Sequence, residues 1–154
     1  LQSYSLYSDR LSNWYSKNLG AEWNGLRHKA MSILQEEATL EEIVRLVGMD
    51  ALGPKDRLTM ETAKAIREDY LHQNAFHETD TFSSLKKQLR MLKLILFFHD
   101  QGLNALNHNV EINEIISLPV VERIGRSKYI TEDNMKAFDE IEHEIKRAFT
   151  ELIG

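Results

Sequence analysis

The sequence predicts an all-α protein, a helical bundle of about six or seven helices, and three observations carry this prediction. Apolar residues recur at steps of three and four along most of the 154 residues, which is the period of an amphipathic helix. Alternation of apolar and polar residues, typical of a half-buried strand, is absent over any useful length. With 7 glycines and 2 prolines, the chain has too few turn residues for a protein of many short strands.

The elements of the first third follow from periodicity and from stop signals. Residues 1–20 are interpreted as an N-terminal connecting segment with one short helix. Helical spacing then runs from 26 to 47 and ends at Gly48, while the capping-box pattern Thr39-x-x-Glu42 indicates a break between two helices near residue 38. Residues 49–55 include a Gly-Pro pair and are expected to form a loop. The residues that set the helical spacing are Leu26, Ala30, Ile33, Leu40, Ile43 or Val44, and Val47.

Two helices are expected in the middle of the chain. The first covers about residues 59–72, where Met60, Ala63, Ile66 and Tyr70 share one face. The second is the strongest and covers about residues 81–106, with a basic outer surface. Its apolar stripe consists of Leu85, Leu89, Leu92, Leu96, Leu103 and Leu106.

The last third is expected to hold two short helices and one long one. Asn107-His108-Asn109 breaks the preceding helix, and short pieces over 110–117 and 120–125 flank Pro119. The last helix is expected to begin at Thr131, because acidic residues follow it in what would be the first turn. Its apolar face consists of Phe138, Ile141, Ile145, Phe149 and Leu152.

Composition excludes several classes of function. The chain has 19 Lys and Arg against 24 Asp and Glu, a net charge of −5, so it lacks the basic footprint of a nucleic-acid binder. It has no cysteine, which excludes disulfides, thiolate metal ligands and a cysteine nucleophile. Its longest apolar run, residues 94–98, is far short of the roughly 20 residues that cross a bilayer. We therefore expect no nucleic-acid partner and no direct membrane contact.

The sequence contains no phosphate-binding loop and no nucleophile motif, so no catalytic residue is assigned. Glu140-x-x-His143 has the spacing of helical di-metal sites, and Asp69-x-x-His72 is the nearest second candidate. Such sites need two Glu-x-x-His motifs and two further glutamates, so a solvated helix face is the preferred reading and no metal ligand is assigned. The polar residues His72, His77, Glu78 and Asp80 are interpreted as capping and surface groups, and His99 as a half-buried packing residue.

A longer pattern lies between residues 46 and 76. Leu-Thr-x-Glu-Thr-Ala over 58–63 is followed by Arg-Glu-Asp-Tyr-Leu-x-Gln-Asn-Ala-Phe over 67–76. This signature resembles the C-terminal helical domain of the catalytic A (alpha) subunit of archaeal/vacuolar-type (A/V-type) rotary ATP synthases. The likeness extends in both directions over essentially the whole chain, and the 67–76 string favours the catalytic subunit over the noncatalytic B subunit.

The resemblance implies that residues 1–154 are the C-terminal domain of a larger subunit, whose ATP-binding domain precedes this region. The full subunit would use ATP or ADP with Mg²⁺ and couple ATP synthesis or hydrolysis to rotation of a central stalk. That rotation drives proton or sodium transport across a membrane, and the subunit would be a peripheral part of the complex on the cytoplasmic side. Its partners would be the neighbouring B subunits and the coiled-coil stalk subunit. The chain alone is expected to be inactive and to hold no cofactor.

By the same resemblance, the loop over 50–56 corresponds to a stalk-facing loop with the acidic run Asp-Glu-Leu-Ser-Glu-Glu-Asp. Three acidic positions of that run are replaced here, which implies that the loop acts by shape and packing more than by charge. We expect Leu52→Asp to impair coupling more than stability. The expected stalk-contact residues are Asp50, Ala51, Leu52, Gly53, Pro54, Lys55 and Asp56.

The resemblance also implies that Tyr70 and Phe76 wall the adenine ring of the nucleotide, with Gln73 beside them. An aromatic face can stack on a purine, which gives affinity with little base selectivity. None of the three can perform phosphoryl transfer, which depends on Lys, Arg and Mg²⁺ at the phosphates. Core packing is the alternative role, above all for Tyr70.

Two other classes of function stay open on the sequence. A free-standing helical protein-interaction module that lacks an ATPase domain would keep the shape of the family without its nucleotide chemistry. A small metal-dependent helical enzyme built on Glu140 and His143 would hold stoichiometric iron or manganese.

Overall fold

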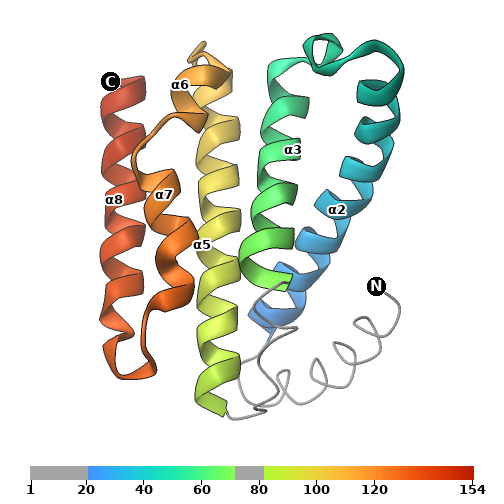
Figure 1. The fold of residues 1–154 in the computed structure, drawn as a ribbon. Helices are drawn as coiled ribbons and strands as arrows, with labels where there is room; N and C mark the ends of the chain where they lie inside the picture. Colours follow the sequence, from blue (N-terminus) through green and yellow to red (C-terminus); the bar gives the residue numbers. More distant parts are fainter. Residues whose placement is uncertain (1–20, 72–81) are drawn as a thin grey trace.

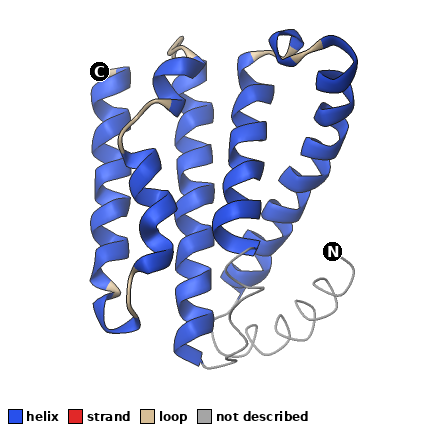
Figure 2. Ribbon diagram, in the orientation of Figure 1, coloured by secondary structure: helices blue, strands red, loops and turns tan. Residues whose placement is uncertain are grey.

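A computed structural model describes residues 21–71 and 82–154. The expectation for a helix within residues 1–20 lies outside these ranges. The described part contains six α-helices and no strand, which confirms the predicted all-α class (Figure 2). The elements are α2 (Ala21–Val47), the 3₁₀ turn η1 (Met49–Ala51), α3 (Pro54–Ala65), the π-helix η2 (Ile66–Leu71), α5 (Phe82–Asn107), α6 (Ile112–Ile116), α7 (Val120–Gly125), the 3₁₀ turns η3 (Arg126–Tyr129) and η4 (Glu132–Asn134), and α8 (Lys136–Ile153).

Helix α5 stands in the middle of the described part (Figure 1). Helix α8 and the short α7 pack on one side of it, and α3 packs on the other. Helix α2 packs against α3 in turn, and the two form a hairpin that ends in η1. The end of this hairpin lies away from α7 and α8 (Figure 1).

The core forms around α5 because other helices pack on more than one of its faces. The predicted leucines Leu89, Leu92 and Leu96 are buried, and so are the residues between them, Met91, Leu94 and Ile95. Gly102 allows α3 to approach closely, since a Cβ there would lie 2.8 Å from Leu58 Cδ2. An amphipathic stripe was therefore too narrow a prediction for a helix that other elements surround.

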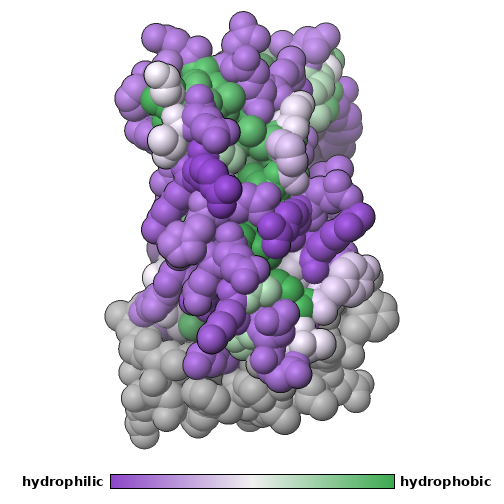
Figure 3. All heavy atoms as spheres, turned by 90° about the vertical axis from the view of Figure 1, so that its left-hand side faces the viewer, coloured by the Kyte–Doolittle hydropathy of each residue, from purple (hydrophilic) through white to green (hydrophobic). Residues whose placement is uncertain are grey.

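Helix α8 keeps the simple amphipathic pattern that the sequence predicts. Phe138, Ile141, Ile145 and Phe149 are buried at steps of three and four. The surface seen from the side of α8 and α7 is largely hydrophilic (Figure 3). The helix begins at Lys136 and not at Thr131, because Glu132–Asn134 form the separate turn η4.

The predicted break near residue 38 is wrong, because α2 is one helix of 27 residues. Its buried residues Ile33, Glu37 and Leu40 continue at helical spacing past the predicted break. No Gly or Pro interrupts the helix there. The helix ends at Gly48 as predicted. Gly48 has φ 92°, a conformation that favours glycine, and its N–H donates to Val44 O at 2.8 Å.

Helix α3 begins five residues before the predicted start at Thr59. Pro54 occupies its first turn, where the fixed φ of proline suits a helix and its missing N–H costs nothing. The break after α5 agrees with the prediction, since Asn109 has φ 67° and stops the helix. The short helices on either side of Pro119 are also confirmed, as α6 and α7.

Candidate functional site

The hairpin tip is the turn between α2 and α3, residues 43–56, and its backbone is closely hydrogen-bonded. Ala51 N–H donates to Gly48 O at 3.3 Å and Leu52 N–H donates to Met49 O at 3.1 Å. Arg57 N–H donates to Gly53 O at 3.0 Å and so starts α3. These bonds hold the short 3₁₀ turn η1 between the two helices, so the connection is hydrogen-bonded at both of its ends.

Four large apolar side chains of the tip are exposed, and we call them the apolar tip cluster: Ile43, Leu46, Val47 and Met49. Leu46 is 79% exposed and Val47 is 66% exposed. Exposed apolar side chains that gather in one place are typical of interaction sites. The sequence predicts Ile43 or Val44, and Val47, on the packed face of the helix; Val44 is half-buried, but Ile43 and Val47 are exposed. The signal that could have found the cluster is an apolar run that continues to the helix end at Gly48.

The predicted contact loop divides into exposed residues and one anchor. Asp50, Ala51, Gly53, Pro54 and Lys55 are exposed, and Asp56 is half-buried. Leu52 is only 7% exposed and is the buried residue of this loop, for which we use the word anchor. Because Leu52 is buried, we expect its substitution to act on folding as well as on the coupling that the sequence predicts.

The three predicted adenine-wall residues are only partly covered by the structure. Tyr70 lies in the π-helix η2 after α3, and its side chain is outside what the structure describes. Gln73 and Phe76 lie outside the described residues. π-Helical backbone is rare and frequently occurs at functional sites.

An ion pair between the buried carboxylate of Glu37 and the half-exposed guanidinium of Arg67 joins the two arms of the hairpin below the tip. Arg67 Nε donates to both carboxylate oxygens of Glu37, at 3.0 and 3.2 Å, and Arg67 Nη2 donates to Glu37 Oε2 at 2.6 Å. These hydrogen bonds raise the pKa of Arg67 above its ordinary value. Neither residue was singled out for such a pair from the sequence, because they are 30 positions apart.

A second polar contact joins α3 to α5. Thr62 Oγ1 and His99 Nδ1 lie 2.6 Å apart and share a buried hydrogen bond. His99 is buried, and not half-buried as predicted. Burial lowers the pKa of His99 below its ordinary value of 6.5, with the charges of Asp100, Lys29 and Lys55 as smaller influences.

We expect the stability of the chain to fall in mild acid because of His99. Between the ordinary pKa and the lowered pKa, the unfolded chain binds a proton at this residue that the folded chain does not. The stability that neutral His99 contributes is therefore present above pH 6.5 and is lost as the pH falls toward the lowered value. The free energy of unfolding in urea, measured from about pH 7.5 to about pH 5.5, should drop less in His99→Gln than in the parent chain. An equal drop in the free energy of unfolding for both proteins over this pH range would contradict this account.

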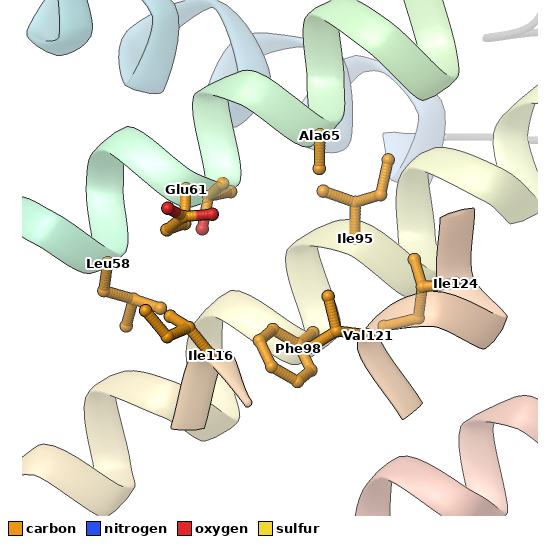
Figure 4. A pocket seen from close by; sticks show the side chains of 9 residues that line it. Leu58, Glu61, Ala65, Ile95, Phe98, Ile116, Val121 and Ile124 are labelled. Atoms are coloured by element: carbon orange, nitrogen blue, oxygen red, sulfur yellow. The ribbon is translucent and has the colours of Figure 1, made fainter. Parts of the chain in front are cut away.

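An apolar pocket of about 70 Å³ lies between α3, α5 and the α6–α7 segment (Figure 4). It is smaller than the roughly 150 Å³ cavity that is known to hold benzene, so it has no room for a purine ring. Glu61 and Thr62 are its polar lining residues, and no cation lines it to meet a phosphate. The pocket is therefore no nucleotide site.

The structure brings no metal-ligand set together in the ranges 21–71 and 82–154, where no group of three or more His, Cys, Asp or Glu could hold an ion. Glu140 and His143 are both exposed on α8. The described helices also include none that is long and apolar enough to cross a membrane.

Fold and site together define a helical domain that presents an apolar hairpin tip. The family model for the C-terminal domain of V and A type ATP synthase matches residues 12–116. The chain is 60% identical over 155 residues to the V-type ATP synthase alpha chain of Acetivibrio thermocellus. It is 55% identical over 154 residues to that of Clostridium botulinum, and 56% identical over 153 residues to that of Thermoanaerobacter pseudethanolicus. These matches cover 99–100% of this chain and 26% of each relative.

The chain therefore belongs to the family of C-terminal domains of V- and A-type ATP synthases, and its relatives are alpha chains. The predicted family is confirmed. The chain spans about a quarter of the length of the curated relatives it matches.

Proposed function

We propose that this chain couples ATP synthesis or hydrolysis in a catalytic subunit to rotation of a central stalk, and so to proton or sodium transport. The observation that carries the proposal is 60% identity to an ATP synthase alpha chain over the whole of this chain. The apolar tip cluster supports it, because a coupling domain needs a stiff projection that contacts another subunit. The alternative, a free-standing interaction module, is not favoured, since the relatives reported above contain this region as 26% of a longer chain.

The proposed contact with the stalk is apolar. Leu46, Val47 and Met49 are exposed beside the predicted contact loop, where acidic residues of the resembling loop are replaced. Ile43, Leu46 and Val47 stand at i, i+3 and i+4 of α2, a spacing by which a helix fits the groove of a partner. We therefore place the contact on the apolar tip cluster together with the exposed residues of the loop 50–56.

The test is a charge at the tip of the complete subunit in the assembled complex. Leu46→Asp should reduce ATP-driven ion transport while ATP hydrolysis continues, because an ionised carboxylate opposes an apolar contact. Transport and hydrolysis are measured on the same reconstituted vesicles. Tyr129→Asp is the matched control, since Tyr129 is 74% exposed and lies in η3, outside the hairpin. Equal transport per ATP in Leu46→Asp and the parent complex would refute the tip contact.

The proposal also covers nucleotide binding by the complete subunit. The complete subunit would bind ATP or ADP with Mg²⁺, and Tyr70, Gln73 and Phe76 are the residues through which this region would wall the adenine. The support is the resemblance of the 67–76 string. The chain by itself would be inactive, since its sequence contains no phosphate-binding loop.

The remaining proposals concern the partners of this domain and its place in the complex. Neighbouring B subunits and the coiled-coil stalk subunit would be the partners, and the domain would lie in the peripheral, cytoplasmic part of the membrane-bound complex. The names of the relatives support a place within an ATP synthase.

A further inference from the structure

Glu37 is the one buried carboxylate among the residues whose exposure the structure describes, and it is 5% exposed. It lies in α2, and its carboxylate accepts three hydrogen bonds from Arg67, which lies in η2 directly after α3. The pair thus joins the two arms of the hairpin below the tip.

Stability alone is a weak reason for this pair. Removing a carboxylate from water is costly, and well-packed apolar residues of similar volume are often as stable as a buried ion pair. An Arg–carboxylate fork differs from apolar packing in its direction, since parallel N–H···O bonds fix both the distance and the orientation of the two groups. A fork of this kind resists the sliding of one helix along another.

Two other ion pairs of α2 do not fix this helix relative to α3. Lys29 pairs with Asp100 of α5, so this pair does not join the two arms, and neither of its side chains is buried as Glu37 is. Arg45 pairs with Glu42 on the same helix, so this pair cannot join the two arms.

We propose that Glu37 and Arg67 form a brace that keeps α2 and α3 in fixed register while the tip carries load. They are positioning residues, because they act through the apolar tip cluster and touch no reacting group. The inference rests on the proposed coupling function and adds to it the residues that transmit displacement to the tip.

The test uses the complete subunit in the assembled, reconstituted complex. The double variant Glu37→Met with Arg67→Met replaces the fork by apolar packing, which keeps the hairpin folded and removes its directional bonds. We expect a loss of ions transported per ATP hydrolysed, with the melting temperature and the hydrolysis rate retained. The matched control is Glu122→Gln with Arg126→Gln, which breaks an exposed ion pair outside the hairpin and should leave the ratio unchanged.

A second variant covers the case in which the double Met protein does not fold. Glu37→Gln keeps the shape of the side chain and removes its charge, and it should lower the same ratio. An unchanged ratio in the folded variants would overturn the brace. If Leu46→Asp still uncouples the complex in that case, the proposed function stands and only the brace fails; if neither change affects the ratio, both fail.

Discussion

Phe138→Ala should lower the free energy of unfolding of the chain by about 3–5 kcal/mol. Phe138 is 0% exposed and packs between α8 and α5, so its removal leaves a cavity in the contact between these two helices. Arg90 lies over the ring, with Cζ 5.9 Å from its centroid, and would lose that contact as well. Urea unfolding followed by circular dichroism measures the change.

Phe97→Ala is the matched control for this prediction. This substitution also removes a phenyl ring, here from α5. The ring of Phe97 is only half-buried, with Lys146 over it. Its substitution should cost clearly less than that of Phe138, because less apolar surface returns to water. Equal losses in the two variants would show that burial of the ring does not set the cost of its removal.

Leu52→Asp should destabilise the chain by roughly 3 kcal/mol or more, since loss of a buried leucine alone costs about 2–5 kcal/mol. The new carboxylate would add the cost of placing a charge at a buried position. Leu46→Asp, six residues away on the exposed side of the tip, should cost less than about 1 kcal/mol, because an exposed site is affected mainly through helix propensity and the helix dipole.

This contrast separates the anchor of the tip from its contact surface. It is measured as the midpoints of urea unfolding for the two single variants and the parent chain. A Leu52→Asp protein as stable as Leu46→Asp would mean that Leu52 does not anchor the turn. Loss of coupling in Leu52→Asp then could not be attributed to folding.

Local patterns predicted those parts of the fold that depend on local physics. The stripe from Phe138 to Phe149 defines α8, because one side of this helix faces water and the other faces the core. Gly48 and Asn109 end helices through their positive φ values, which few other residues adopt readily. The first turn of α3 at Pro54 lies within the predicted loop, because a Gly-Pro pair favours a loop as well as a helix start.

Long-range contacts decided the rest of the candidate site. The capping-box pattern at Thr39 predicts a helix start, but the packing of Ile33 and Leu40 keeps α2 continuous. Ile43 and Val47 continue the apolar period of the helix, yet they are exposed. Periodicity states which residues share a face and does not state where the neighbouring helix ends.

The sequence by itself determined that this chain is all-α and, through the string from Arg67 to Phe76, that it resembles the catalytic subunit of rotary ATP synthases. These conclusions depend on the order of residues along the chain. Only the tertiary structure showed that Leu52 is an anchor, that Leu46 is exposed, and that Glu37 meets Arg67. These facts depend on how two helices far apart in sequence pack side by side, which no local pattern contains.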